Sequence, residues 1–190
     1  MNRPTDQLVR EHEHILALLN VLERLGELVT SEGASAPLHA IERALEFLRV
    51  YADGCHHGKE EQCLFPAMHA AGMPREAGPI AVMLAEHEEG REQISEMAAA
   101  LEGLRAKQPS SGPAFGAAAA RYVALLRHHI LKENQVLFPM AEDLLGEVAK
   151  AELLQRFAAV ERDDVGADVV AQLLADAEAL AAEHGAAARD

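Results

Sequence analysis

The sequence predicts an all-α protein: an up-down-up-down four-helix bundle followed by additional C-terminal helices. Leu and Ala are abundant, Trp is absent, and aromatic residues make up 4% of the chain, so the core is mainly aliphatic. Apolar side chains recur three and four residues apart over four long segments, which is the period of an amphipathic helix. The connections between these segments are short, and short connections make neighbouring helices antiparallel.

The first two segments form a predicted helical hairpin. The first helix spans about residues 4–29 and ends at the polar stretch TSEG (30–33). The second helix spans about residues 35–65. Its first turn accommodates Pro37, because proline is well suited to that position. We expect Pro66 to end or kink this helix, because proline lacks an N–H group and clashes with the preceding turn.

The next two segments form a second predicted hairpin, which follows a turn at GMP (72–74). The third helix spans about residues 79–106 and the fourth about residues 114–138. Between them lies KQPSSGP (107–113), the plainest linker in the chain.

The sequence divides into a bundle, residues 1–145, and a C-terminal helical extension, residues 146–190. Residues 147–161 predict a short helix, and an apolar stripe that begins at Val165 predicts a longer amphipathic helix. We expect the extension to pack on the bundle or on the partner of a homodimer. We expect His184, near its end, to be exposed to solvent.

Composition and charge exclude several kinds of partner. A net charge of −14 argues against binding nucleic acid or an anionic membrane. The N-terminus has no apolar run typical of a signal peptide, and no apolar stretch is long enough to cross a bilayer. Cys55 and Cys63 lie about 12 Å apart along one predicted helix, beyond disulfide reach. A cytoplasmic location is therefore expected.

An eleven-residue phrase occurs twice, and it contains metal-ligand chemistry. Residues 56–66 read HHGKEEQCLFP and residues 129–139 read HILKENQVLFP. The tripeptide Glu-His-Glu also occurs twice, at 11–13 and 86–88. Each predicted hairpin thus supplies a lone His and then a His-x-x-x-Glu pair. Residues four apart share one face of a helix, so this His and Glu can bind one metal centre together.

The four histidines of these motifs lie at matching depths in the predicted bundle. His12 and His87 lie about eight residues after the starts of their helices, and His56 and His129 lie about nine residues before the ends of theirs. These four ends fall on the same side of an up-down-up-down bundle. All four imidazoles therefore lie about 12–14 Å from that end. A bundle with four unrelated buried histidines and no metal does not account for this match.

The two glutamates of the repeated phrase indicate a pair of cations. Glu60 and Glu133 lie one helical turn after His56 and His129. Two carboxylates that face each other across a core repel, and their burial is costly unless they are paired. Two cations bridged by both carboxylates remove that cost. Imidazole and carboxylate ligands suit iron, while manganese and zinc remain open.

The role of His57 is open on spacing alone. It is rotated about 100° around the helix from His56, so it either reaches the second metal beside His87 and His129 or points outward. Glu61 is expected to be a partner of a ligand or a surface acid. We expect four other histidines to lie outside the site: His14, His39, His69 and His128. The predicted metal ligands are His12, His56, His57, Glu60, His87, His129 and Glu133.

These motifs resemble the hemerythrin-like family of HHE cation-binding domains over about residues 5–145. The resemblance rests on Glu-His in the first and third helices and on His-x-x-Lys-Glu with Leu-Phe-Pro in the second and fourth. It implies a four-helix bundle that holds two iron ions joined by an oxo or hydroxo bridge. By position, the resemblance makes Glu60 and Glu133 bridging ligands, and it makes four histidines terminal ligands: His12, His56, His87 and His129.

The chain departs from the oxygen-carrying members of that family at two positions. Those proteins have a second His four residues after the helix-three His, where this chain has Arg91. They also place the helix-four acid five residues after its His, where this chain has Asn134 and the acid is Glu133. His57 would replace the missing imidazole. The departures argue against reversible oxygen carriage but not against metal binding.

Several functions are compatible with such a site. The first is the binding or sensing of a small ligand, either a diatomic (O2 or NO) or peroxide, or a response to iron supply. The alternatives are an enzyme that consumes hydrogen peroxide, a protein that handles or stores iron, and a module that regulates a separate chain. Ferritin-like bundles use more carboxylates and the order Glu-x-x-His, the reverse of the order in this chain.

Overall fold

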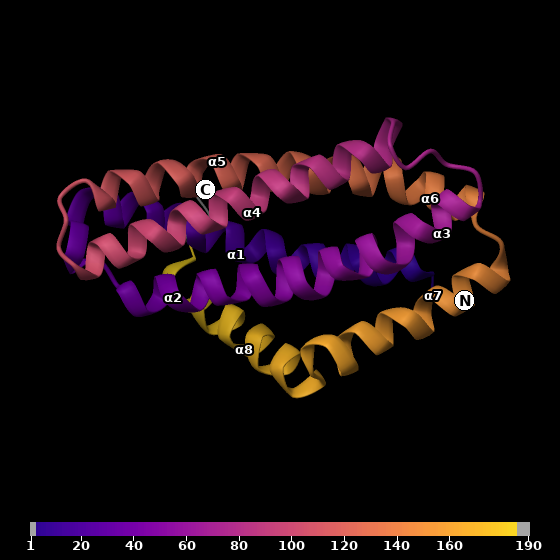
Figure 1. Cartoon of the computed structure of the whole chain (residues 1–190). Helices are drawn as coiled ribbons and strands as arrows, with labels where there is room; N and C mark the ends of the chain where they lie inside the picture. Colours follow the sequence, from indigo (N-terminus) through magenta and orange to yellow (C-terminus); the bar gives the residue numbers. More distant parts are fainter. Residues whose placement is uncertain (1–2, 186–190) are drawn as a thin grey trace, which may run out of the picture.

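The structure, a computed structural model, describes residues 3–185, and within that range it contains helices and no strand (Figure 1). Four long antiparallel rods form the bundle, which confirms the predicted fold class. The first rod is α1 (Pro4–Glu32), and the third is α4 (Gly78–Arg105). Each rod packs beside two others, in the order α1, α2, α4, α5 around the bundle.

The second and fourth rods each consist of several helical segments that follow one another without a break. The second contains α2 (Leu38–Phe47), the π-helical segments η2 (Leu48–His57) and η3 (Glu60–Leu64), and α3 (Phe65–Ala70). The fourth contains α5 (Ser111–Lys132), the π-helical segment η4 (Glu133–Leu137) and α6 (Phe138–Leu144). A short 3₁₀ turn, η1 (Gly33–Ser35), connects the first two rods.

The repeated Phe-Pro step explains the wide turns before it. Pro66 and Pro139 lack an N–H group, and a proline ring clashes with the carbonyl four residues earlier. In both rods a π-helical segment ends directly before the Phe, which widens the helix where the clash would occur. The second rod therefore continues past Pro66 to Ala70 rather than ending at about residue 65.

A polar layer divides the apolar core of the bundle in two. One apolar cluster contains Ile15 and Cys55, and the other contains Leu8 and Cys63. The motif residues lie between these positions along the chain, so the layer crosses the bundle at one level. Both cysteines are buried and free.

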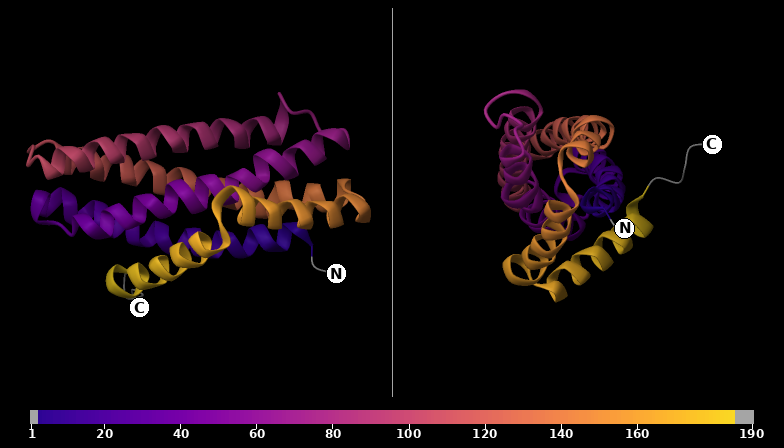
Figure 2. Two further views of the ribbon diagram at one scale, coloured as in Figure 1. Left: turned by 60° about the horizontal axis from the view of Figure 1, so that its bottom comes forward. Right: turned by 90° about the vertical axis from the view of Figure 1, so that its right-hand side faces the viewer.

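The C-terminal extension packs along one side of the bundle, as a V of two helices (Figures 1 and 2). It comprises α7 (Glu147–Ala159), the π-helical segment η5 (Val160–Val165) and α8 (Ala167–His184). The two helices are joined at Gly166, whose φ of +99° suits glycine. Helix α8 packs against α1 and α2. His184 is 21% exposed, less than the solvent-exposed position expected from sequence.

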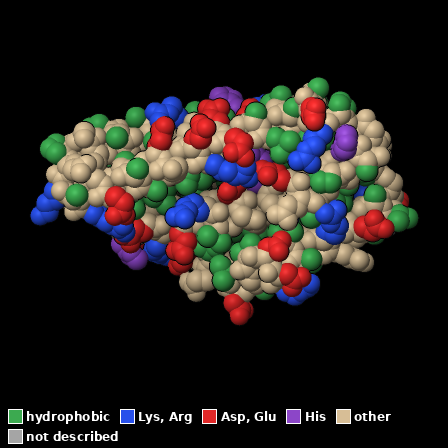
Figure 3. Space-filling model, viewed as in Figure 1, with side chains coloured by type: hydrophobic (Ala, Val, Ile, Leu, Met, Phe, Trp, Pro, Cys, Tyr) green, Lys and Arg blue, Asp and Glu red, His purple; other side chains and the backbone are tan. Residues whose placement is uncertain are grey.

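On the face that Figure 3 shows, acidic and basic side chains lie interspersed. No helix within residues 3–185 combines the length and apolar character that crossing a membrane requires.

Candidate metal centre

The predicted ligands converge in the polar layer as two overlapping groups of buried donors. One group contains His12, His56, Glu60 and Glu133, and the other contains His57, Glu60, His87 and His129. Within each group the donor atoms lie within 4.8 Å of one another. Glu60 belongs to both groups. The structure therefore brings together all seven side chains that the sequence singled out, including His57.

Each carboxylate lies between an imidazole of one group and an imidazole of the other. Glu133 Oε2 lies 3.2 Å from His12 Nε2 and 3.3 Å from His129 Nε2. Glu60 Oε1 lies 3.7 Å from His56 Nε2, and its Oε2 lies 3.5 Å from His87 Nε2. The two carboxylates are thus placed as bridges between the groups.

Five imidazoles are held by their outer nitrogen. Each Nδ1 lies 2.7 to 3.3 Å from a side-chain oxygen of Asp, Glu or Asn, to which it donates. The pairs are His12 with Asn134, His56 with Glu11, His57 with Asp53, His87 with Glu61, and His129 with Glu86. A carboxylate oxygen or an amide oxygen can only accept, so Nδ1 carries the proton. The lone pair is then on Nε2, the nitrogen that a metal would use.

The inner donor atoms fit a cation and little else. The seven side chains are at most 4% exposed. Among the described residues, both oxygens of Glu60 and of Glu133 lack a hydrogen-bond donor, as does Nε2 of His56. His87 Nε2 and His129 Nε2 face each other at 3.2 Å with lone pairs on both. Buried polar atoms without partners are rare and costly, and positive ions between them remove that cost.

Burial keeps two of the imidazoles, those of His56 and His57, in the neutral form. Burial lowers the pKa of His56 well below its usual value, and the nearby His12 and His57 lower it further. Burial and His87 lower the pKa of His57 to about 3, against the opposing effect of Asp53. Neutral imidazole is the form that binds metals.

The surroundings shift the pKa values of the two carboxylates in opposite directions. Burial and the neighbouring Glu133 raise the pKa of Glu60 well above its usual value. Burial would also raise the pKa of Glu133, but His129 and His12 outweigh burial and lower it to about 2. A cation between these side chains would favour the charged form of both.

The repeated Glu-His and Lys positions support the ligands within each hairpin. Glu11 accepts from His56 Nδ1 and also from the ammonium of Lys59. In the second hairpin Glu86 accepts from His129 Nδ1 and from Lys132. Both lysines are therefore paired with these acids. They help to hold the acids that orient the histidines.

Each hairpin also holds the lone histidine of the other. Glu61 and Asn134 occupy equivalent positions of the repeated phrase, and they accept from His87 and His12 respectively. The equivalent phenylalanines stack on the same rings, with ring centres 6.0 Å apart for Phe65 and His87 and 5.5 Å apart for Phe138 and His12. Each copy of the phrase thus supplies the acceptor and the stacking phenylalanine for the lone histidine of the other hairpin.

One half of the site carries an addition that the other half lacks. His57 stacks on His87 with ring centres 3.8 Å apart, and its counterpart in the second phrase is Ile130. Arg91, which sequence showed only as a departure, donates to Asp53 at 2.9 Å and to Glu61 at 2.6 Å. It therefore holds the acceptors of His57 and His87. The spacing of Asp53, four residues before His57, was the available signal for this arrangement.

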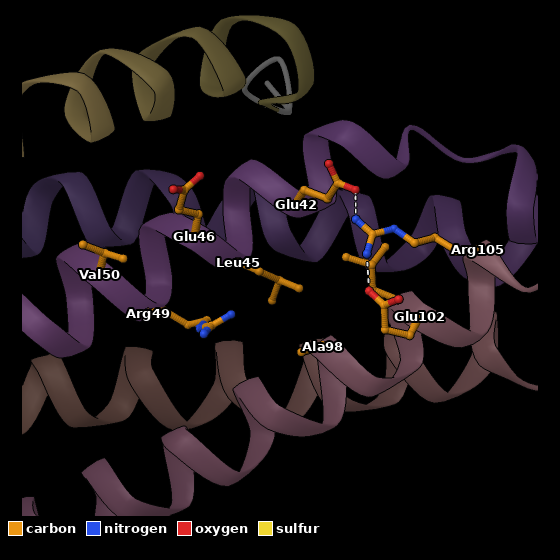
Figure 4. Close-up of a pocket in the computed structure, with 9 residues that line it drawn as sticks. Glu42, Leu45, Glu46, Arg49, Val50, Ala98, Glu102 and Arg105 are labelled. Atoms are coloured by element: carbon orange, nitrogen blue, oxygen red, sulfur yellow. Dashed lines mark hydrogen bonds and ion pairs between the residues drawn. The ribbon is translucent and has the colours of Figure 1, made fainter. Parts of the chain in front are cut away.

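Residues expected outside the site lie outside it. His14 packs against Tyr51, 6.5 Å between ring centres, while His39, His69 and His128 are exposed. The surface pocket in Figure 4 also lies apart from the donors. There Arg105, on α4, pairs with Glu42 and Glu102.

Comparison with known proteins agrees with this geometry. The model of the hemerythrin HHE cation binding domain matches residues 3–141. Uncharacterized proteins of Mycobacterium bovis (Mb2018) and Mycobacterium tuberculosis (Rv1995) are each 24% identical over 153 residues, 80% of this chain and 58% of theirs. The iron-sulfur cluster repair protein YtfE of Musicola paradisiaca is 38% identical over 89 residues, 45% of this chain and 40% of its own.

The chain spans 58% of the length of the mycobacterial relatives. The match to the family model covers the four rods except the last three residues of α6, and it includes every residue of the two donor groups. The resemblance inferred from the repeated motifs is therefore confirmed. The chain belongs to the hemerythrin HHE cation-binding domain family and is a metal-binding helical protein.

Proposed function

We propose that this protein holds two iron ions in the layer and uses them to bind or sense a small ligand such as O2, NO or peroxide. The observation that carries the proposal is the donor set: two groups of buried imidazoles that share Glu60 and are spanned by Glu60 and Glu133. Imidazole and carboxylate together suit iron. Two cations also offset the two carboxylates that the core would otherwise hold unpaired.

Terminal ligands would be His12 and His56 at one ion, and His57, His87 and His129 at the other. Bound there, iron would supply open coordination positions and accessible redox chemistry. The protein's own part is to orient the ligands and to exclude water. Asp, Glu and Asn side chains fix each imidazole by its Nδ1, and the layer lies between two apolar clusters. Because the donors are almost fully buried, only a small molecule can reach them without opening of the bundle.

The test is optical. Protein loaded with Fe(II) without oxygen should show new visible charge-transfer absorption when O2 or NO is admitted, at two iron ions per chain. Bands that persist after the ligand is added, without its continued consumption, support binding or sensing. Rapid release of O2 from added hydrogen peroxide would instead make the protein a peroxide-consuming enzyme. Absence of any spectral response to O2, NO and peroxide would contradict the proposal.

A role in iron–sulfur cluster repair is a second candidate, favoured by the similarity to a repair protein over 89 residues. That role requires iron to leave the centre under physiological conditions, whereas a sensor retains it. Transfer of iron from the loaded protein to a cluster-depleted ferredoxin, faster than iron escapes to a chelator, would favour repair over sensing.

Replacing His57 with alanine tests the division into two ions. The variant removes one of three imidazoles from one group and leaves His12 and His56 untouched. We expect iron content to fall from two ions toward one per chain, measured by elemental analysis after anaerobic loading. His14→Ala is the matched control, because His14 belongs to neither group and its variant should retain both ions. Full iron content in the His57→Ala protein would remove His57 from the ligand set.

A further inference from the structure

A fully buried lysine beside the metal centre is held by an acid from the C-terminal extension. Lys59 is 0% exposed. Its Nζ lies 2.5 Å from Glu11 Oε1 and 2.6 Å from Glu161 Oε1, in η5. Gln7 Nε2 donates to the same two oxygens, at 3.1 and 2.8 Å. These four side chains close a ring of hydrogen bonds between α1, the second rod and the extension.

The ring is one contact away from a predicted ligand. Glu11 uses Oε1 for Lys59 and Gln7, and it accepts from His56 Nδ1 with Oε2 at 2.8 Å. Any change in the position or charge of Glu11 is therefore transmitted to His56. Partners that accept from the outer nitrogen of a ligating histidine set its orientation and its basicity.

The second hairpin provides an internal comparison. Lys132 is the counterpart of Lys59, but its side chain is 41% exposed and its described ion pair is with Glu86 alone. Water can solvate an exposed ammonium, whereas a buried one needs charged partners within the protein. Within the bundle the buried ammonium of Lys59 has one carboxylate partner, Glu11, and Glu161 of the extension supplies the second.

The placement of Glu161 depends on packing that belongs to the extension. Phe157 and Val160 are buried in the apolar cluster that also contains Cys63. Arg156 donates to the carbonyl of Gln62, the group that Pro66 leaves without its usual helical donor. These contacts fix the start of η5 against the second rod. Glu161 lies outside residues 3–141, the part matched by the family model.

We propose that Glu161 is a positioning residue for the metal centre. It gives the Lys59 ammonium a second carboxylate partner, so that Lys59 does not draw the Glu11 carboxylate away from His56 Nδ1, the nitrogen that Glu11 orients. The extension thereby strengthens binding of the ion in the His12–His56 group and has no such effect on the other ion. This inference rests on the proposed function, in which the centre holds two ions.

The test is the rate at which a chelator removes iron from Glu161→Gln, which keeps the shape of the side chain but removes its charge. Loss of a partner of a ligating histidine typically costs about 10- to 100-fold in metal affinity. Each of the two ions should give one phase of iron release. Because Glu161 acts on His56 through Lys59 and Glu11, we expect the phase of the His12–His56 ion to accelerate by about 10-fold, the low end of that range. Asp163→Asn is the control: Asp163 lies in the same turn but pairs with exposed Arg162.

Two further measurements separate positioning from a merely structural role. In the His57→Ala background, only the His12–His56 ion is expected to remain. There Glu161→Gln should accelerate its release by the same factor as in the wild-type background. The thermal midpoint of the metal-free protein reports stability. Equal acceleration of both phases, together with a lower thermal midpoint, would mean that Glu161 only stabilises the fold and would overturn the inference.

The two possible failures are distinguishable. Wild-type protein that binds two ions, and Glu161→Gln that releases both at wild-type rates, would refute the role of Glu161 and leave the proposed function intact. Wild-type protein that binds no iron, or a single ion, would refute the proposed function and this inference with it.

Discussion

Replacing Glu60 with leucine is expected to abolish binding of both metal ions and, at the same time, to stabilise the metal-free protein. Glu60 belongs to both donor groups, so its removal takes a ligand from each. In the metal-free protein its buried oxygens lack donors among the described residues and face Glu133. A buried polar group without partners is costly, and replacing buried ionic networks by apolar side chains of similar volume is often neutral or stabilising, by up to about 4 kcal/mol. The opposite signs of the two effects make the prediction specific.

Elemental analysis measures the first effect, and denaturant unfolding of the metal-free proteins measures the second. Glu13→Leu is a suitable control, because Glu13 follows the predicted ligand His12 but is exposed. The control should bind metal like wild type. A Glu60→Leu protein that keeps two ions, or whose metal-free form is clearly less stable than wild type, would contradict the bridging role.

Removing the metal from wild-type protein is expected to cause a large loss of thermal stability. The folded protein presents the complete donor set, and the unfolded chain does not. Binding to the folded state alone stabilises by about 4 kcal/mol when free metal is a thousandfold above its dissociation constant. In a domain of this size that corresponds to roughly 8–16 °C in the midpoint.

Thermal unfolding with and without a chelator measures this loss. Re-addition of Fe(II) without oxygen should restore the midpoint. In Glu60→Leu the chelator should have no effect, because no ion is left to remove. Equal midpoints for wild type with and without metal would mean that the protein itself satisfies the buried donors, and that cations do not stabilise the polar layer.

The level of the metal centre could be predicted from sequence because helices have a fixed rise per residue. Equal distances of His12, His56, His87 and His129 from the helix ends place them in one layer, and the structure brings them together. The direction of the His57 side chain could not be predicted from spacing alone. A residue that directly follows His56 can point either into the layer or outward. In the structure, His57 points into the layer because it stacks on His87 and donates to Asp53. The helix period alone does not predict either contact.

The supporting residues were harder to predict because their partners lie far away in the chain. Arg91 reaches Asp53 and Glu61 in another rod, and Glu161 reaches Lys59 from the extension. Such pairs depend on how rods and extension pack, not on periodicity within one segment. The π-helical turns were missed for a different reason. The sequence predicts that Pro66 ends or kinks the helix, whereas in the structure a widened turn lets the helix continue to Ala70.

The most direct test of a two-ion centre is an anomalous-difference map, recorded at the iron absorption edge from crystals of the protein loaded with Fe(II). We expect two peaks in the polar layer. One would lie among the Nε2 atoms of His12 and His56, and the other among those of His57, His87 and His129, with Glu60 and Glu133 between them. A map with no peak in the layer, or with peaks only at the surface, would contradict the presence of such a centre.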